Sequence, residues 1–299
     1  MPNLHDIERR IGSVKSTMQI TRTMEMVAAA KIRHASVRVQ QAAPYADSMA
    51  EMLANVATRV GDSDHALLKS REEVKNILLI VVVSDRGLAG GFNSNVLRHA
   101  EEFLNKKRSE GAQVQVVACG KKAVGYFTYR EVEPVLSFIS ESADPTVEQA
   151  TTVANYAIKG YEEGTIDEVV LLYNHSRNAA EQTLREEQVL PVDTEALLDT
   201  AMQTPLEDSE TINPALDFEP GAEAVLTQLV PSYVRTMIFR ALVDSAAGEQ
   251  GARRNAMHSA TENANDMVET LTRIYNRVRQ SAITTEISEI VGGAAALEE

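Results

Sequence analysis

The first segment of the chain repeats apolar residues at helical spacing. From Leu4 to Ala42 they recur at alternating steps of three and four, with Thr21 and Glu25 as the polar exceptions. Such steps place side chains on one face of a helix, and an a/d pattern kept over several heptads is typical of a coiled coil. The pattern predicts a long N-terminal helix, which we expect Pro44 to kink or to divide.

The last segment carries a second apolar stripe, from Val234 through Ala264 to Val278, after the final proline at Pro231. Proline is favourable in the first turn, so we expect this helix to begin at Pro231 and to run to about Val291. A helix of roughly 60 residues needs a partner for its stripe, and the N-terminal helix offers one. We therefore predict an antiparallel coiled coil within one chain, with the end of the longer C-terminal helix protruding as a single helix.

Between the two helices the pattern changes to short apolar runs. The sequence predicts strands at 76–84, 113–118 and 168–174, helices at 94–108 and 147–161, and an edge strand at 183–192. Strands buried on both faces and separated by helices are typical of a mainly parallel sheet. The expected fold is of a mixed α+β and α/β class, a long antiparallel coiled coil plus a Rossmann-like α/β domain. The expected segments are 1–60 (coiled-coil helix), 74–195 (α/β domain), 196–230 (connection) and 231–299 (coiled-coil helix).

Composition narrows the class of protein. The 299 residues carry a net charge of −14 and no tryptophan, and the basic excess is confined to the first helix. A nucleic-acid or anionic-membrane surface is therefore not expected. No apolar run reaches the ~18 residues of a membrane span, and the first residues do not resemble a signal peptide. The single cysteine, Cys119, is expected to be a small buried hydrophobe without a disulfide.

A glycine-rich loop, S-D-R-G-L-A-G-G-F-N at 84–93, follows the first predicted strand. Phosphates often bind where a strand leads into a helix. The spacing of Gly87, Gly90 and Gly91 matches neither the dinucleotide motif nor the P-loop, however, and the loop has no lysine. We expect a tight structural turn.

No cluster in the sequence predicts catalysis. The six histidines lack metal-ligand spacing, and His175, which follows a predicted strand, has no nucleophile motif beside it. We expect no catalytic residue, no metal and no cofactor. The C-terminal helix instead ends in a polar turn and a tip of small residues, 292–296, a shape suited to a close-fitting apolar opening.

Four segments, in order along the whole chain, resemble the gamma subunit family of rotary ATP synthases. They are I-G-S-V-K-S-T-M-Q-I-T-R-T-M-E-M at 11–26 with its continuation to Arg33, the loop at 84–93 with Ala89 where the family has cysteine, F-E-P at 218–220, and the stretch from Glu249 to Ala294. The resemblance implies a non-catalytic rotor shaft, present in one copy. Its coiled coil would stand inside a hexamer of alpha and beta subunits, and its α/β domain would lie beside the epsilon subunit on a ring of c subunits. Proton flow would turn the shaft and drive binding changes at the catalytic beta subunits, on the cytoplasmic side of a bacterial membrane.

The same resemblance implies roles for individual residues. The positions that match rotor–stator contacts are Met24, Arg253, Gln280, Thr284 and Glu286, and those that match a foot near the c ring are Phe218 and Glu219. Gly248 and Gly251 interrupt the long helix and are expected to loosen it.

Two other hypotheses stay open on the sequence. One is a self-associating coiled-coil scaffold with an α/β head. The other is an α/β enzyme that binds a phosphorylated ligand at 85–93.

Overall fold

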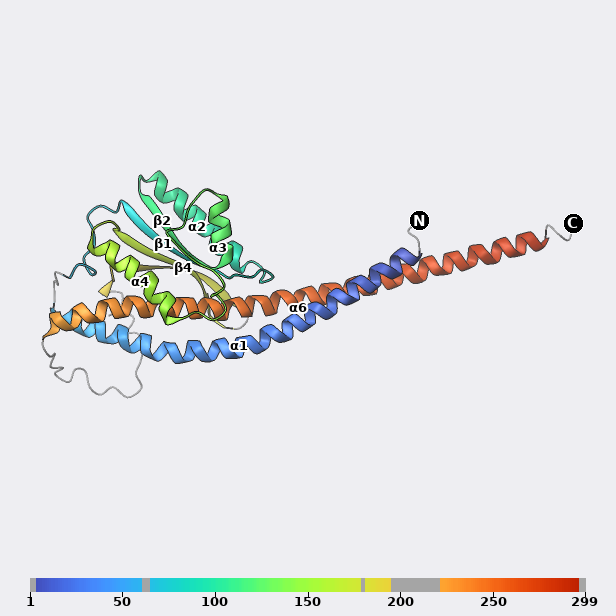
Figure 1. Cartoon of the computed structure of the whole chain (residues 1–299). Coiled ribbons are helices and arrows are strands. Elements are labelled where there is room, and N and C mark those ends of the chain that lie inside the picture. Colours follow the sequence, from blue (N-terminus) through green and yellow to red (C-terminus); the bar gives the residue numbers. More distant parts are fainter. Residues whose placement is uncertain (1–3, 61–64, 179–180, 195–220, 296–299) are drawn as a thin grey trace. The chain divides into compact units, whose positions relative to one another are not determined.

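The computed structural model describes residues 4–60, 65–178, 181–194 and 221–295 (Figure 1). By its contacts the chain divides into two units, residues 1–29 with 253–299, and residues 30–252. Helices α1 (Leu4–Val60) and α6 (Ala222–Ala295) each contribute to both units.

The larger unit, 30–252, is built on a five-stranded sheet in the order β3-β2-β1-β4-β5. Its strands are β1 (Asn76–Val82), β2 (Gln113–Cys119), β3 (Leu136–Phe138), β4 (Glu168–Ser176) and β5 (Gln182–Leu190). The strand β1 pairs in parallel with β2 and β4, β2 pairs in parallel with β3, and β5 runs antiparallel to β4. The predicted edge strand at 183–192 is thus confirmed as β5.

Helices cover both faces of this sheet (Figure 1). The helices α2 (Phe92–Ser109) and α3 (Lys121–Tyr129) pack on one face, against Ile77, Leu79 and Val81 of β1. Helix α4 (Val147–Glu162) packs on the other face, together with α6 and the end of α1. Because successive residues of a strand point to opposite faces, a central strand needs the unbroken apolar run that 77–83 provides.

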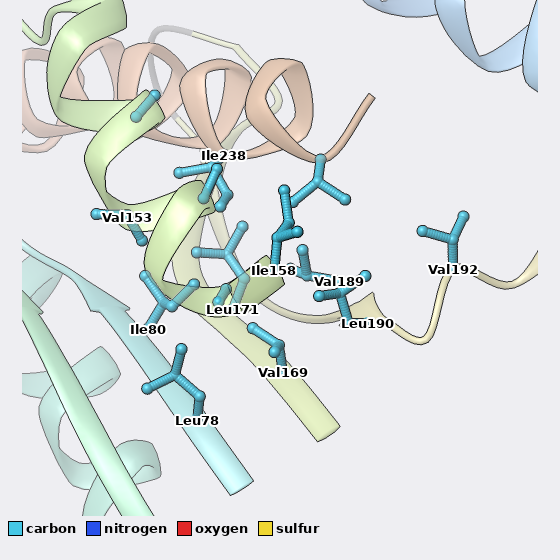
Figure 2. Packing of buried hydrophobic residues seen from close by; sticks show 14 of the residues in the cluster. Leu78, Ile80, Val153, Ile158, Val169, Leu171, Val189, Leu190, Val192 and Ile238 are labelled. Carbon is cyan, nitrogen blue, oxygen red and sulfur yellow. The ribbon is translucent and has the colours of Figure 1, made fainter. Parts of the chain in front are cut away.

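The second face is the larger core. Figure 2 shows Leu78 and Ile80 of β1 and Leu171 of β4 below Val153 of α4 and Ile238 of α6. All five side chains are completely buried. The C-terminal part of α1 and the N-terminal part of α6 therefore complete the core of the central sheet.

The predicted start of the C-terminal helix at Pro231 is wrong, because α6 begins at Ala222 and continues through Pro231. A proline inside a helix costs about 3 kcal/mol, since it removes one hydrogen bond and crowds the preceding turn. Leu226 and Val230 lie before it and are completely buried. Burying two such side chains contributes roughly 1.5–3 kcal/mol each, which offsets the proline. Helix α1 likewise continues through Pro44.

Two elements were not predicted, α3 and β3. Helix α3 contains Gly125 and several aromatic and β-branched residues, whose helix propensity is low. The strand β3 has three residues, too few to show an alternating pattern. Pairing with β2 stabilises β3, and this contact is not visible in a local pattern.

Gly248 lies close to neighbouring elements of the larger unit. A Cβ atom there would lie 3.3 Å from the Phe92 ring and 3.5 Å from the carbonyl oxygen of Asn174. The missing side chain therefore permits α6 to approach α2 and β4. That Gly248 also loosens the helix stays a prediction.

Candidate functional site

The smaller unit consists of the N-terminal part of α1 and the C-terminal part of α6, paired with each other. The hydroxyl oxygens of Thr21 and Thr261 lie 2.8 Å apart, and Nδ1 of His258 lies 3.0 Å from the carboxylate of Glu25. The later residue on α1 faces the earlier residue on α6, so the two helices run antiparallel. The predicted intramolecular pairing is confirmed.

The seam of this pair is built from small and apolar side chains. Its most buried members are Ile7 and Ala28 on α1 and Met257 and Ala264 on α6. Ala28 is 1% exposed, and small side chains allow two helices to pack closely. The heptad pattern of the sequence thus describes a real seam.

Thr21 and Glu25, the two polar exceptions in the predicted stripe, each have a partner on α6. Thr21 is buried and meets Thr261, while Glu25 meets His258. A polar pair in a coiled-coil seam lowers stability but favours one register, because a slip breaks the contact between the two helices. Each threonine hydroxyl would then keep only its bond to a carbonyl oxygen of its own helix, that of Met18 or Met257. These contacts set the alignment of α1 against α6.

Past Val278, no other described residue buries the side chains of α6 as far as Val291. Every residue from 279 to 291 is exposed within the chain, so the predicted single-helix end is confirmed for these residues. Gln280, Thr284 and Glu286 all lie in this stretch, and the Thr284 hydroxyl donates to the carbonyl oxygen of Gln280. No other residue that the structure describes buries this surface.

The uncovered end also carries an apolar row that the sequence reasoning missed. Ile283, Ile287, Ile290 and Val291 are 47%, 56%, 71% and 62% exposed. Their spacing of four and three was the available signal, since it places three isoleucines on one face. Exposed apolar rows of this kind are typical of interaction surfaces.

The other predicted contact residues differ in exposure. Met24 is half-buried on α1, whereas Arg253 is 8% exposed and has interaction partners. Met24, Arg253, Gln280, Thr284 and Glu286 all belong to the smaller unit. Phe218 and Glu219 lie outside the described residues.

The glycine-rich loop connects β1 to α2. Gly90 has φ 57°, a left-handed conformation that glycine adopts without strain. Leu88, two residues earlier, has φ 62°, which is a strained conformation for leucine. A Cβ at Gly87 would come no closer than 4.0 Å to another residue, and one at Gly91 would meet the flexible side chain of Asn95. Among the three predicted glycines, backbone conformation therefore accounts for Gly90.

An internal carboxylate, Asp85, occupies the edge of the sheet where phosphates often bind. It accepts hydrogen bonds from the backbone N–H groups of Lys121 (2.7 Å), Ser140 (3.0 Å) and Ser142 (3.0 Å). Partial burial opposes ionisation, but these donors together outweigh it and lower the pKa of Asp85. The backbone donors at this edge thus bind a residue of the chain itself.

The end of β4 is held to two helices by side-chain hydrogen bonds. Asn174 is buried and donates to the carbonyl oxygen of Phe92 at 2.7 Å. Nδ1 of His175 lies 2.5 Å from the Asp244 carboxylate, which also accepts from the backbone N–H of Ser176 at 3.0 Å. These contacts tie β4 to α2 and α6.

Cys119 is 2% exposed at the end of β2, and burial raises the pKa of its thiol to about 12. The thiol therefore stays protonated and unreactive, as expected for a small core residue. No group of His, Cys, Asp and Glu in the described part of the chain could hold a metal ion.

Comparison with known proteins defines the class. The sequence model of the ATP synthase family matches residues 3–297, so the chain belongs to this family. Its relatives include gamma chains of ATP synthase. That of Desulforamulus reducens is 43% identical over the full length of both chains, and that of Chlorobaculum tepidum is 40% identical, also over both full lengths. That of Heliobacterium modesticaldum is 42% identical over 99% of this chain and all of the relative.

Solved structures share the fold. The Euglena gracilis mitochondrial ATP synthase in rotational state 3 contains a chain that matches with a TM-score of 0.64 and 19% identity, over 98% of this chain and 94% of that one. The central stalk and c-ring structure of the Tetrahymena thermophila mitochondrial enzyme contains another, with a TM-score of 0.57 and 24% identity, over 81% of this chain and 99% of that one.

Proposed function

We propose that this chain is the gamma subunit of a proton-translocating F-type ATP synthase, the central rotor shaft that couples rotation of the c ring to binding changes at the catalytic beta subunits. The full-length likeness to gamma chains supports the assignment. The observation that carries the mechanism is the antiparallel pair of chain ends, with an uncovered helix beyond it.

Torque transmission requires a shaft that resists twisting. A pair of helices packed along a seam resists torsion better than one helix, because relative movement would break many side-chain contacts at once. The polar pair Thr21–Thr261 opposes sliding of one helix along the other. The paired segment is therefore suited to transmitting torque.

Rotation also requires contacts that break and re-form at each step. Met24, Arg253, Gln280, Thr284 and Glu286 are the positions that we assign to contacts with the surrounding hexamer. Exposed polar and charged contacts contribute about 0–1 kcal/mol each, so a turning shaft can exchange them. Phe218 and Glu219 are assigned to the foot near the c ring on the sequence alone.

The partners follow from this role. We assign the alpha and beta subunits, the epsilon subunit and the c ring as partners of one gamma copy, on the cytoplasmic face of a bacterial membrane. Catalysis belongs to the beta subunits in this assignment, and this chain regulates it mechanically. No helix in the described ranges is both long and apolar enough to cross a bilayer.

A single substitution in the assembled enzyme tests the coupling role. Met24→Lys introduces a long charged side chain at a half-buried position of the proposed contact surface. ATP-driven proton pumping into inverted vesicles should fall severalfold, while ATP hydrolysis should change far less. The reason is that the beta sites would still hydrolyse ATP, but hydrolysis would be poorly coupled to rotation of the shaft.

The matched control is Met52→Lys, the same change at an exposed methionine of α1 that we assign to no contact. It should leave the ratio of pumping to hydrolysis as in the unmodified enzyme. An equal loss of pumping and hydrolysis in Met24→Lys would contradict the coupling role.

A further inference from the structure

The middle of α1 is unusually basic for this chain. The sequence has 43 aspartates and glutamates, yet none lies between Glu25 and Asp47. Lys31, His34 and Arg38 fall in this stretch at steps of three and four, so they share one face of α1.

These three side chains line a cavity of about 280 Å³ in the larger unit. Its other walls are the loop residues Ala143 and Asp144, before α4, and three residues of α6, Val243, Ala246 and Gln250. At a share of about 30 Å³ per water molecule, the space holds several waters or a group of comparable size. The cavity is therefore large enough for one or two phosphoryl groups.

Three donor groups around this cavity, two of them on exposed side chains, have no acceptor among the described residues. Neither Lys31 nor His34 has an ion pair or a side-chain hydrogen bond to any residue that the structure describes. Gln250 is only 5% exposed, and its amide likewise has no partner among the described residues. The fully buried, unpaired side-chain atoms of the described residues do not include the Gln250 amide, so this amide is accessible from the cavity and can donate to an anion bound there.

Acidic side chains of α6 near the cavity point to other places. Asp244 is engaged by His175 and Ser176, and Glu249 lines a separate small cavity beside Gly120. Among the residues that line the basic cavity, Asp144 is the one carboxylate.

Asp144 pairs with Arg38, whose other nitrogen donates to the carbonyl oxygen of Pro145 at 2.6 Å. The cluster of Lys31, Arg38 and Asp144 therefore carries a net positive charge, and the amide of Gln250 adds neutral donors.

We propose that this cavity binds a phosphate-class oxyanion, best matched by a diphosphate group. The Lys31 ammonium supplies charge, His34 and Gln250 supply hydrogen-bond donors, and Arg38 adds a guanidinium beside them. Charge-assisted hydrogen bonds of this kind are the strong ones in proteins. The site is separate from the glycine-rich loop, and the proposal does not depend on the rotor function.

Calorimetric titration of the full-length chain with pyrophosphate at low ionic strength tests the site. We expect saturable binding of one anion per chain. Lys31→Gln should weaken it about tenfold, which corresponds to about 1.4 kcal/mol. Gln250→Glu, which keeps the shape but replaces the donor by a carboxylate, should abolish binding.

Lys106→Gln is the control, since Lys106 lies in the last turn of α2 and does not line the cavity. It should bind pyrophosphate as the unmodified chain does. If Gln250→Glu does not fold, as judged by circular dichroism, the pair Lys31→Gln and His34→Gln carries the test.

Inorganic phosphate and ATP distinguish the source of the group. ATP should bind as well as pyrophosphate, and phosphate more weakly, if phosphoryl oxygens are what the cavity recognises. Absence of saturable binding, equal effects of Lys31→Gln and Lys106→Gln, or binding of ATP without pyrophosphate would each overturn the proposal.

Discussion

At the scale of single residues, Gly120 determines how the C-terminal edge of the sheet closes. It links β2 to α3 with φ 104°, and its N–H donates to the carbonyl oxygen of Phe138 at 2.9 Å. A Cβ there would lie 2.2 Å from the carbonyl oxygen of Val83. Both the conformation and the contact exclude any other residue, although nothing in the local sequence marks Gly120 as special.

Gly120→Ala should therefore lower the free energy of unfolding by about 2–4 kcal/mol, because it combines a strained backbone with a backbone clash. Urea unfolding followed by circular dichroism measures the change. The control is Gly125→Ala in α3, where a Cβ would meet nothing within 4 Å. That change should stabilise the protein by up to about 1 kcal/mol, since alanine favours a helix over glycine. Similar effects of the two substitutions would contradict the argument.

At the scale of elements, the pairing of α1 with α6 is the central feature. Its register depends on a polar pair inside an otherwise small and apolar seam. The alternative of a self-associating scaffold requires the same stripes to pair between two copies of the chain. The two arrangements differ in whether Thr21 meets Thr261 of its own chain.

A cysteine pair at Thr21 and Thr261 distinguishes them. The hydroxyl oxygens are 2.8 Å apart, so the two sulfur atoms can approach bonding distance after small adjustments. Oxidation should give a cross-linked monomer with altered mobility on a non-reducing gel. Cys119 should not interfere, because it is buried.

The control pair keeps the cysteine at Thr21 and places the second one at Thr272 instead of Thr261. Thr272 is exposed, and its hydroxyl bonds within its own helix. With cysteines at Thr21 and Thr272, little cross-linked monomer is expected. A cross-linked dimer as the main product of the Thr21 and Thr261 pair would contradict intramolecular pairing.

At the scale of the whole molecule, most elements pack into a buried core, whereas the C-terminal end of α6 stays exposed. The sheet and its helices form two buried clusters. Residues 279–291, by contrast, are all exposed and pack against no other described residue closely enough to be buried. Residues 279–291 therefore add little to the buried core, which fits the proposal that they bind partners.

Truncation after Thr284 separates these roles. The removed residues make no buried contacts among those described, so the free energy of unfolding should change by less than about 0.5 kcal/mol. Recovery of alpha and beta subunits with the tagged chain should fall, since the exposed isoleucines at 287 and 290 are lost. Marked destabilisation of the truncated chain with unchanged recovery would show that this end serves the fold instead.

Sequence patterns alone determined the elements whose stabilisation is regular and local. The heptads of the N-terminal segment, the apolar run of β1 and the alternation of strands and helices predicted the pair of long helices and the central sheet. Hydrophobic periodicity is repeated over many residues, so single exceptions such as Thr21 do not hide it. The resemblance of four ordered segments extended this to a family, which the full-length relatives confirm.

Only the tertiary structure decided the features that depend on contacts between distant residues. The start of α6 at Ala222, the glycine at 120, the capture of Asp85 by three backbone N–H groups and the cavity beside Lys31 all arise from such contacts. A local pattern records which face of an element is apolar, but not which group lies opposite it. Hydrogen bonds, close approaches and cavities are set by that opposing group, and folding alone brings it into place.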